Sequence, residues 1–214
     1  MSTRLYLIRH GESEANKIDA FAGHSQFNLT EQGRAQAQKA AEYLATLHVD
    51  AIYASDLPRA YQTAEPTAKR LGMEIITSKA LREINAGDWE GRTFTDLQTN
   101  DPTYATWMTD IGHARPTGGE SVTELQTRVL AELTAIAERH EGQTVFVFTH
   151  ATPIRTFAAH CAGKTADTMR EIPWMSNASV THATYERGSG EFTMIEYDKH
   201  DFMGDLVTVL AKNT

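Results

Sequence analysis

The chain has 214 residues, of which 41% are hydrophobic and 22% charged, and its formal net charge is −8 at pH 7. This length favours one domain, 1–214, and the negative charge argues against nucleic acid or an anionic membrane as a partner. Cys161 is the only cysteine, which excludes an intrachain disulfide. No signal-peptide pattern opens the chain and no run reaches the ~18 apolar residues of a membrane span, so we expect a cytoplasmic protein.

Short apolar runs alternate with longer amphipathic segments along the chain. The short runs are rich in β-branched and aromatic residues, which predicts strands at 4–8, 50–54, 73–77 and 144–149. Apolar residues at helical spacing predict helices over 29–47, 57–71 and 120–140, and a shorter one from Thr152 to Cys161. Strands that alternate with helices indicate a mainly parallel sheet covered on both faces, a three-layer α/β/α sandwich.

Capping signals mark the starts of three of these helices. Thr30 is placed to cap the first, and Ser55 or Asp56 the second. Ser121 and Glu124 have the spacing of a capping box at the start of the third.

Two later segments depart from the regular alternation. Residues 180–198 read as two strands joined by a Gly-Ser-Gly turn, a hairpin that can extend the sheet at its edge. Residues 84–119 contain several aromatic residues and prolines and predict a lid-like insertion over one end of the sheet. We expect the insertion to line a substrate cavity with Trp89, Trp107, Met108 and His113.

Chemically active residues follow three of the predicted strands. Arg9 and His10 follow the first strand together with Gly11, which we expect to permit a tight turn. Arg59 follows the second, in the first turn of a helix, and His150 follows the fourth. The carboxyl ends of parallel strands meet at one edge of a sheet, where ligands bind. Arginine and histidine in one pocket suit a phosphoryl group, with a neutral imidazole as nucleophile.

Other kinds of site fit the sequence less well. No HExxH, CxxC or closely spaced His/Asp cluster indicates a metal site, and arginines beside the histidines would repel a cation. The phosphate-binding GxxxxGK[ST] loop and the GxSxG serine motif are also absent from the sequence.

Six segments, in order, resemble the histidine phosphatase superfamily, also called phosphoglycerate-mutase-like. The match runs over roughly residues 4–160, about three quarters of the chain, and the segments read RHGESEAN (9–16), LTEQGRAQA (29–37), SDLPRAYQTAE (55–65), LREINAGDWEG (81–91), GGES (118–121) and VFTHATPIR (147–155). The resemblance implies a phosphohistidine mechanism in which His10 is the phosphorylated residue. It further implies that Arg9, Arg59 and His150 hold the phosphoryl oxygens, with His150 cationic, and that Asn16 makes a further polar contact.

The resemblance also assigns two residues outside the strand ends. Gly23 matches the loop that approaches the substrate, and Glu83 matches the proton donor, which has to arrive protonated. No metal and no cofactor are implied, because the arginines supply the positive charge.

The expected function is hydrolysis of a small phosphorylated metabolite. Ala15 and His24 stand where the superfamily's cofactor-dependent mutases carry tryptophan, which favours a phosphatase over a phosphoglycerate mutase. Two alternatives stay open: mutase-type phosphoryl transfer, and a non-catalytic module that binds a phosphorylated ligand. The sequence also leaves open whether the chain forms a homodimer.

Overall fold

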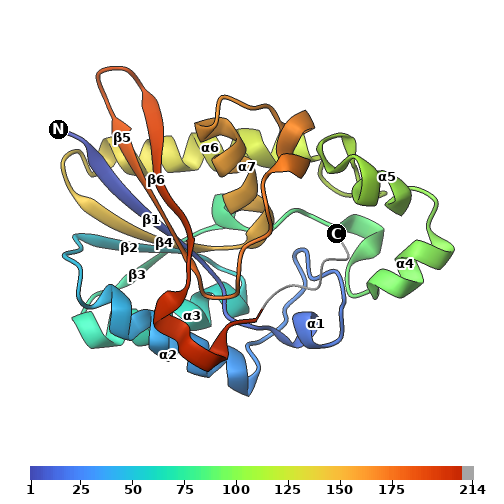
Figure 1. Cartoon of the computed structure of the whole chain (residues 1–214), viewed down its shortest axis with the longest axis horizontal. Helices are drawn as coiled ribbons and strands as arrows, with labels where there is room; N and C mark the ends of the chain where they lie inside the picture. Colours follow the sequence, from blue (N-terminus) through green and yellow to red (C-terminus); the bar gives the residue numbers. More distant parts are fainter. Residues whose placement is uncertain (209–214) are drawn as a thin grey trace.

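The computed structural model describes residues 1–208, the side chain of Asp167 excepted, and within them lies a six-stranded sheet with the order β3-β2-β4-β1-β5-β6 (Figure 1). The last six residues of the predicted domain 1–214 lie outside the described part. The parallel strands are β1 (Thr3–Arg9), β2 (Ala51–Ser55), β3 (Ile75–Ser78) and β4 (Thr144–Thr149). An antiparallel hairpin, β5 (Val180–Glu186) and β6 (Glu191–Lys199), extends the sheet beside β1. The mainly parallel sheet with an added hairpin is confirmed.

The strands supply two separate cores, because successive side chains of a strand point to opposite faces of the sheet. In β4, Val145 and Val147 belong to one core, and Phe146 and Phe148 belong to the other. Strand β1 divides its side chains in the same way. Burial on both faces explains why these strands read as continuous apolar runs in the sequence.

Helices cover both faces of the sheet. Helices α2 (Glu31–Leu44) and α3 (Pro58–Leu71) pack on one face, and α6 (Val122–Arg139) and α7 (Ala151–Cys161) on the other (Figure 1). Three layers result, which confirms the α/β/α prediction. Short 3-10 turns occupy Lys79–Leu81, Gly87–Trp89, Ile111–His113, Ala166–Glu171 and Asp201–Leu206.

The predicted helix caps are correct at α2 and α6 and wrong at α3. Thr30 accepts a hydrogen bond at the start of α2, and Ser121 forms the expected capping box at α6. The N-cap of α3 is Leu57, without a side-chain hydrogen bond. Ser55 still belongs to β2, and its hydroxyl lies 2.8 Å from the ring of His150. Asp56 pairs instead with Arg82.

The 84–119 segment is fixed to the loop after helix α1 (Glu14–Lys17), at the same end of the molecule (Figure 1). Backbone hydrogen bonds of 2.8 Å join Phe21 to Arg92 and Phe94 to Asp19. The segment contains α4 (Phe94–Asn100) and α5 (Tyr104–Thr109). No helix within residues 1–208 is long and apolar enough to cross a membrane.

Candidate active site

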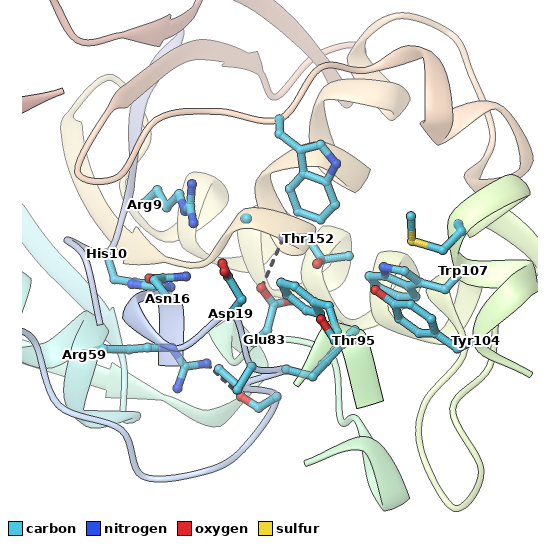
Figure 2. A pocket seen from close by; sticks show the side chains of 18 of the residues that line it. Arg9, His10, Asn16, Asp19, Arg59, Glu83, Thr95, Tyr104, Trp107 and Thr152 are labelled. Atoms are coloured by element: carbon cyan, nitrogen blue, oxygen red, sulfur yellow. Dashed lines mark hydrogen bonds between the residues drawn. The ribbon is translucent and has the colours of Figure 1, made fainter. Parts of the chain in front are cut away.

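A cavity of about 570 Å³ opens where the parallel strands end, and Figure 2 shows the side chains that line it. Strands β1 and β4 are neighbours in register, with Arg9 opposite Thr149. The next residue of each strand is a histidine, and the ring centroids of His10 and His150 are 5.2 Å apart. The sheet topology therefore brings together groups that are about 140 residues apart in the chain.

His10 has the geometry of a nucleophile. Its side chain is 4% exposed, and its Nδ1 lies 2.7 Å from the carbonyl oxygen of Gly11. A carbonyl only accepts hydrogen bonds, so Nδ1 carries the proton and Nε2 keeps its lone pair. Burial, together with the nearby cations Arg59 and Arg9, lowers the pKa of His10 well below its ordinary value. The ring is therefore neutral near pH 7.

Arg9 and Arg59 are buried cations held by backbone carbonyls. Arg9 Nη1 donates to the carbonyl oxygen of Met175, and Arg59 donates to those of Gly23 at 2.7 Å and Ser25 at 3.0 Å. Burial lowers the pKa of each arginine to about 10, so both stay charged at pH 7. Neither forms an ion pair with a carboxylate of residues 1–208. Because an unpaired buried charge is costly, this arrangement favours binding of an anion.

His150 is fully buried beside His10 and lies at the start of helix α7. Its Nε2 is hydrogen-bonded to the Ser55 hydroxyl, and its buried Nδ1 has no hydrogen-bond partner in the described part of the chain. Burial, together with Arg59 and His10, lowers the pKa of His150 well below the ordinary value, which disfavours the expected cationic form in the free protein. His150 is not among the residues that line the cavity, but its ring is adjacent to that of His10 and its Nδ1 is able to donate a hydrogen bond when that nitrogen carries the proton.

Glu83 lies on the wall of the cavity and is 9% exposed. Its Oε1 accepts a hydrogen bond from the amide of Ile84 at 2.7 Å, and its Oε2 accepts one from the amide of Thr152 at 3.2 Å (Figure 2). Its own carbonyl oxygen accepts a 2.8 Å hydrogen bond from Arg128 and lies 2.9 Å from His24 Nε2. The backbone and the side chain of Glu83 are thus both fixed beside Arg9, His10 and Arg59, which form the phosphate end of the cavity.

Asn16 also lines the cavity, with its amide group oriented by neighbours. Its Oδ1 accepts hydrogen bonds from the Ser13 amide at 3.0 Å and from Asn177 at 3.3 Å. The amide nitrogen is left to donate to a bound oxygen.

Gly11 is needed for close packing. Its φ is not in the left-handed region, so the expected tight turn is not the reason for glycine. A Cβ atom at Gly11 would lie 2.5 Å from the carbonyl oxygen of Gly33, the third residue of helix α2. The segment that carries His10 therefore rests directly on the backbone of α2.

Gly23 lies in a loop that holds Arg59, and Glu90 fixes this loop. Gly23 has a φ of 43°, and a Cβ atom there would lie 2.1 Å from Glu90 Oε1. The Glu90 carboxylate accepts hydrogen bonds from the amides of His24 at 2.6 Å and Ser25 at 2.8 Å. Glu90 thereby positions the carbonyl groups that bind the Arg59 guanidinium. No spacing in the sequence indicates this role for Glu90.

The other end of the cavity is largely apolar. Its apolar walls are formed by Ala20, Phe21, Ala22, Phe94, Tyr104, Trp107, Met108 and Trp174. The expected contributions of Trp107 and Met108 are therefore confirmed, whereas those of Trp89 and His113 are wrong. Trp89 is fully buried in the core, and its indole donates to Asp101. His113 lies on the surface, 2.9 Å from Asp110.

Two further lining residues were not expected from the sequence. Asp19 and Trp174 reach the cavity from a loop and from the segment before β5, and neither has a diagnostic spacing. Among residues 1–208, no group of three or more His, Cys, Asp or Glu side chains is arranged to hold a metal ion.

Comparisons with known proteins agree with this geometry. The chain is 34% identical over 160 residues to phosphoserine phosphatase 1 of Hydrogenobacter thermophilus. The aligned residues make up 74% of this chain and 75% of that protein. It is 33% identical over 167 residues to the adenosylcobalamin/alpha-ribazole phosphatase of Escherichia coli, 78% of this chain and 82% of the other.

A solved structure also resembles the chain over nearly its whole length. The mycobacterial glucosyl-3-phosphoglycerate phosphatase superposes with a TM-score of 0.82 at 29% identity, covering 94% of this chain and all of the other. Residues 5–198 match the family described as the histidine phosphatase superfamily (branch 1). This protein belongs to that superfamily.

Proposed function

We propose that the protein hydrolyses phosphate monoesters of small metabolites through a phosphohistidine on His10, without a metal ion. The observation that carries this proposal is the neutral His10 ring, whose free Nε2 lies beside the buried, unpaired cations Arg9 and Arg59. The relatives named above are phosphatases of three different small molecules, which supports the reaction class rather than one substrate.

In the first step, His10 Nε2 attacks phosphorus while the bond from phosphorus to the ester oxygen breaks. Arg9, Arg59 and His150 stabilise the charge on the phosphoryl oxygens, because phosphoryl transfer depends mainly on positioning and electrostatics. Glu83, as a carboxylic acid, donates its proton to the leaving oxygen. The alcohol departs and the phosphoryl group stays on His10.

In the second step, water releases the phosphoryl group. The Glu83 carboxylate accepts a proton from the water as its oxygen attacks phosphorus, and the phosphorus–nitrogen bond breaks. Inorganic phosphate leaves, His10 is neutral again and Glu83 is again a carboxylic acid. The amides of Ile84 and Thr152 support this role because they hold the carboxyl group in place through both steps.

Trapping the phosphoenzyme tests the proposal. Wild-type protein is mixed with a ³²P-labelled monoester, quenched without acid and digested, and the label should be found on His10. His10→Ala should lose the label and turnover on the order of 10⁴-fold or more. His48→Ala, which changes an exposed histidine, is the matched control. Label on another residue, or a near-normal rate in His10→Ala, would contradict the mechanism.

Further measurements separate the alternatives. EDTA should leave activity intact, and orthovanadate, which mimics the transition state at phosphorus, should inhibit. A mutase would transfer the label to a second hydroxyl compound instead of releasing phosphate, and a binding module would bind without turnover. The homodimer and the cytoplasmic location remain predictions, to be checked by sedimentation and by cell fractionation.

A further inference from the structure

The side chains that line the cavity differ in chemical character between its two ends. Figure 2 shows Arg9, His10 and Arg59 at one end, Tyr104 and Trp107 at the other. Among the described residues that line the cavity, Arg9 and Arg59 are the only cations. The part that receives the alcohol portion of a substrate therefore has no positive side chain of its own.

Asp19 places a negative charge at the junction of the two ends. Figure 2 shows its carboxylate inside the cavity, between the side chains of Arg9 and Glu83. No hydrogen bond or ion pair joins this carboxylate to another residue of the described chain. A carboxylate without a partner in a substrate cavity is free to interact with the substrate.

The backbone around Asp19 fixes the direction of this side chain. Asp19 has a φ of 51°, a left-handed conformation that aspartate tolerates better than most residues. Its amide donates to the carbonyl oxygen of Asn16 at 3.3 Å, and its carbonyl oxygen accepts from Phe94 at 2.8 Å. An uncommon backbone conformation held from both sides indicates that the position of the side chain matters.

The walls beyond Asp19 suit an apolar or aromatic group with a polar edge. The ring centroids of Phe21 and Trp107 are 4.9 Å apart, and Trp174 closes the wall from the opposite segment. The Tyr104 side chain lines the cavity, and its buried hydroxyl has no hydrogen-bond partner in the described part of the chain.

Resting on the phosphatase activity proposed above, we infer that Asp19 is a specificity-determining residue. It selects phosphate monoesters of neutral or cationic alcohols with an apolar or aromatic face, and it disfavours substrates with a second negative charge. A carboxylate on the alcohol portion would lie near Asp19, and no cation other than Arg9 and Arg59 lines the described cavity to compensate it, whereas an ammonium group would be attracted.

Three esters with one frame test this inference. They are 4-(aminomethyl)phenyl, 4-(hydroxymethyl)phenyl and 4-(carboxymethyl)phenyl phosphate, whose leaving oxygens are alike and whose charges differ. In competition, kcat/KM of the wild type should fall in that order, with the cationic ester preferred over the anionic one by about tenfold or more. Asp19→Asn should reduce this ratio to within about threefold. Glu74→Gln removes an exposed negative charge away from the cavity and should keep the wild-type ratio.

The outcomes are distinguishable because the ratio does not depend on the fraction of folded protein. Equal hydrolysis of the three esters, or a ratio unchanged by Asp19→Asn, would overturn the inference and leave the phosphatase activity established. An equal loss of kcat on all three esters in Asp19→Asn would also overturn it, since Asp19 would then act in the chemical step. No hydrolysis of any ester by the wild type would overturn the proposed function itself.

Discussion

The two ends of the cavity are built in different ways. The phosphate end takes Arg9, His10 and Arg59 from the sheet edge and the start of a helix, and these side chains are almost fully buried and fixed by backbone groups. The other end takes mainly apolar side chains from a loop and from residues 84–119, and Phe21, Tyr104 and Trp107 among them are also buried. The residues proposed for the reaction and those proposed for substrate selectivity thus come from separate parts of the chain. Substitutions can therefore change the selectivity while the reaction is kept.

Glu83 lies between the two ends, and after His10 its replacement should have the largest effect. Glu83→Gln keeps size but cannot transfer a proton, so phosphorylation of His10 by an alkyl ester should slow by about 10²–10⁴-fold. A nitrophenyl ester needs little protonation and should slow far less in this step. Single-turnover rapid-quench measurements isolate the step from hydrolysis of the phosphoenzyme. Equal slowing for both esters would mean that Glu83 only positions the substrate.

Arg59→Ala should affect every ester alike. The guanidinium is fully buried and, in the mechanism proposed above, binds the phosphoryl group that all monoesters share; losing such a contact costs about 2–5 kcal/mol. We expect kcat/KM to fall at least about 30-fold for ethyl, phenyl and nitrophenyl phosphate. Arg70→Ala, an exposed arginine of the same helix, is the matched control. Losses that differ more than about tenfold among the esters would show that the two ends are not independent.

Trp174→Leu should show the opposite pattern. The Trp174 ring lines the cavity and stacks on the Arg155 guanidinium, whose central carbon lies 3.9 Å from the ring centroid. A missing aromatic contact should lower kcat/KM for phenyl phosphate by about tenfold and hardly change ethyl phosphate. The measured quantity is the ratio of the two esters in competition. A ratio that stays at the wild-type value would remove Trp174 from the substrate wall.

The smallest expected effect is a shift in pH dependence at the phosphate end. His10 attacks only when neutral, and its lowered pKa keeps it neutral as the pH falls below 6.5. Arg59 is one cause of this lowering, so in Arg59→Ala the acid limb of the phosphorylation rate should move to higher pH. The ester itself ionises near pH ~6, but equally for both proteins, so the difference between the two profiles reports on His10. A limb that moves to lower pH would contradict the assignment.

Sequence patterns predict the residues of the phosphate end well because the topology of the sheet determines their positions. Residues that follow parallel strands must meet at one edge, and His10 and His150 do so because β1 and β4 pair in register. Asp19 and Glu90 could not be predicted in this way. Their positions depend on the pairing of the loop near Phe21 with residues 91–94, which leaves no periodicity in the sequence.

For two residues, tertiary contacts determine a role that differs from the one predicted by the local sequence. Ser55 has the residue type and position of a helix cap, but its hydroxyl bonds with His150 across the sheet edge and accepts only the Leu57 amide, at 3.3 Å, near the helix start. Trp89 lies in the insertion expected to line the cavity, yet packing with Phe21 and Tyr104 encloses it in the core. A local sequence pattern shows which structural roles are open to a side chain, and the tertiary contacts of that side chain determine which role it has.

The contact between Gly11 and Gly33 has a consequence for any attempt to stabilise this protein. Gly33 lies in the first turn of α2, and glycine within a helix is less favourable than alanine by roughly 0.5–1 kcal/mol. Gly33→Ala is therefore the kind of change that a search for thermostability would try first. A Cβ atom at Gly33 would lie 2.0 Å from the carbonyl oxygen of Glu12, two residues after the nucleophile. Alanine at this position would therefore require the backbone of Glu12, close to His10 in the chain, to move, and stabilising substitutions are better sought on the exposed face of α2.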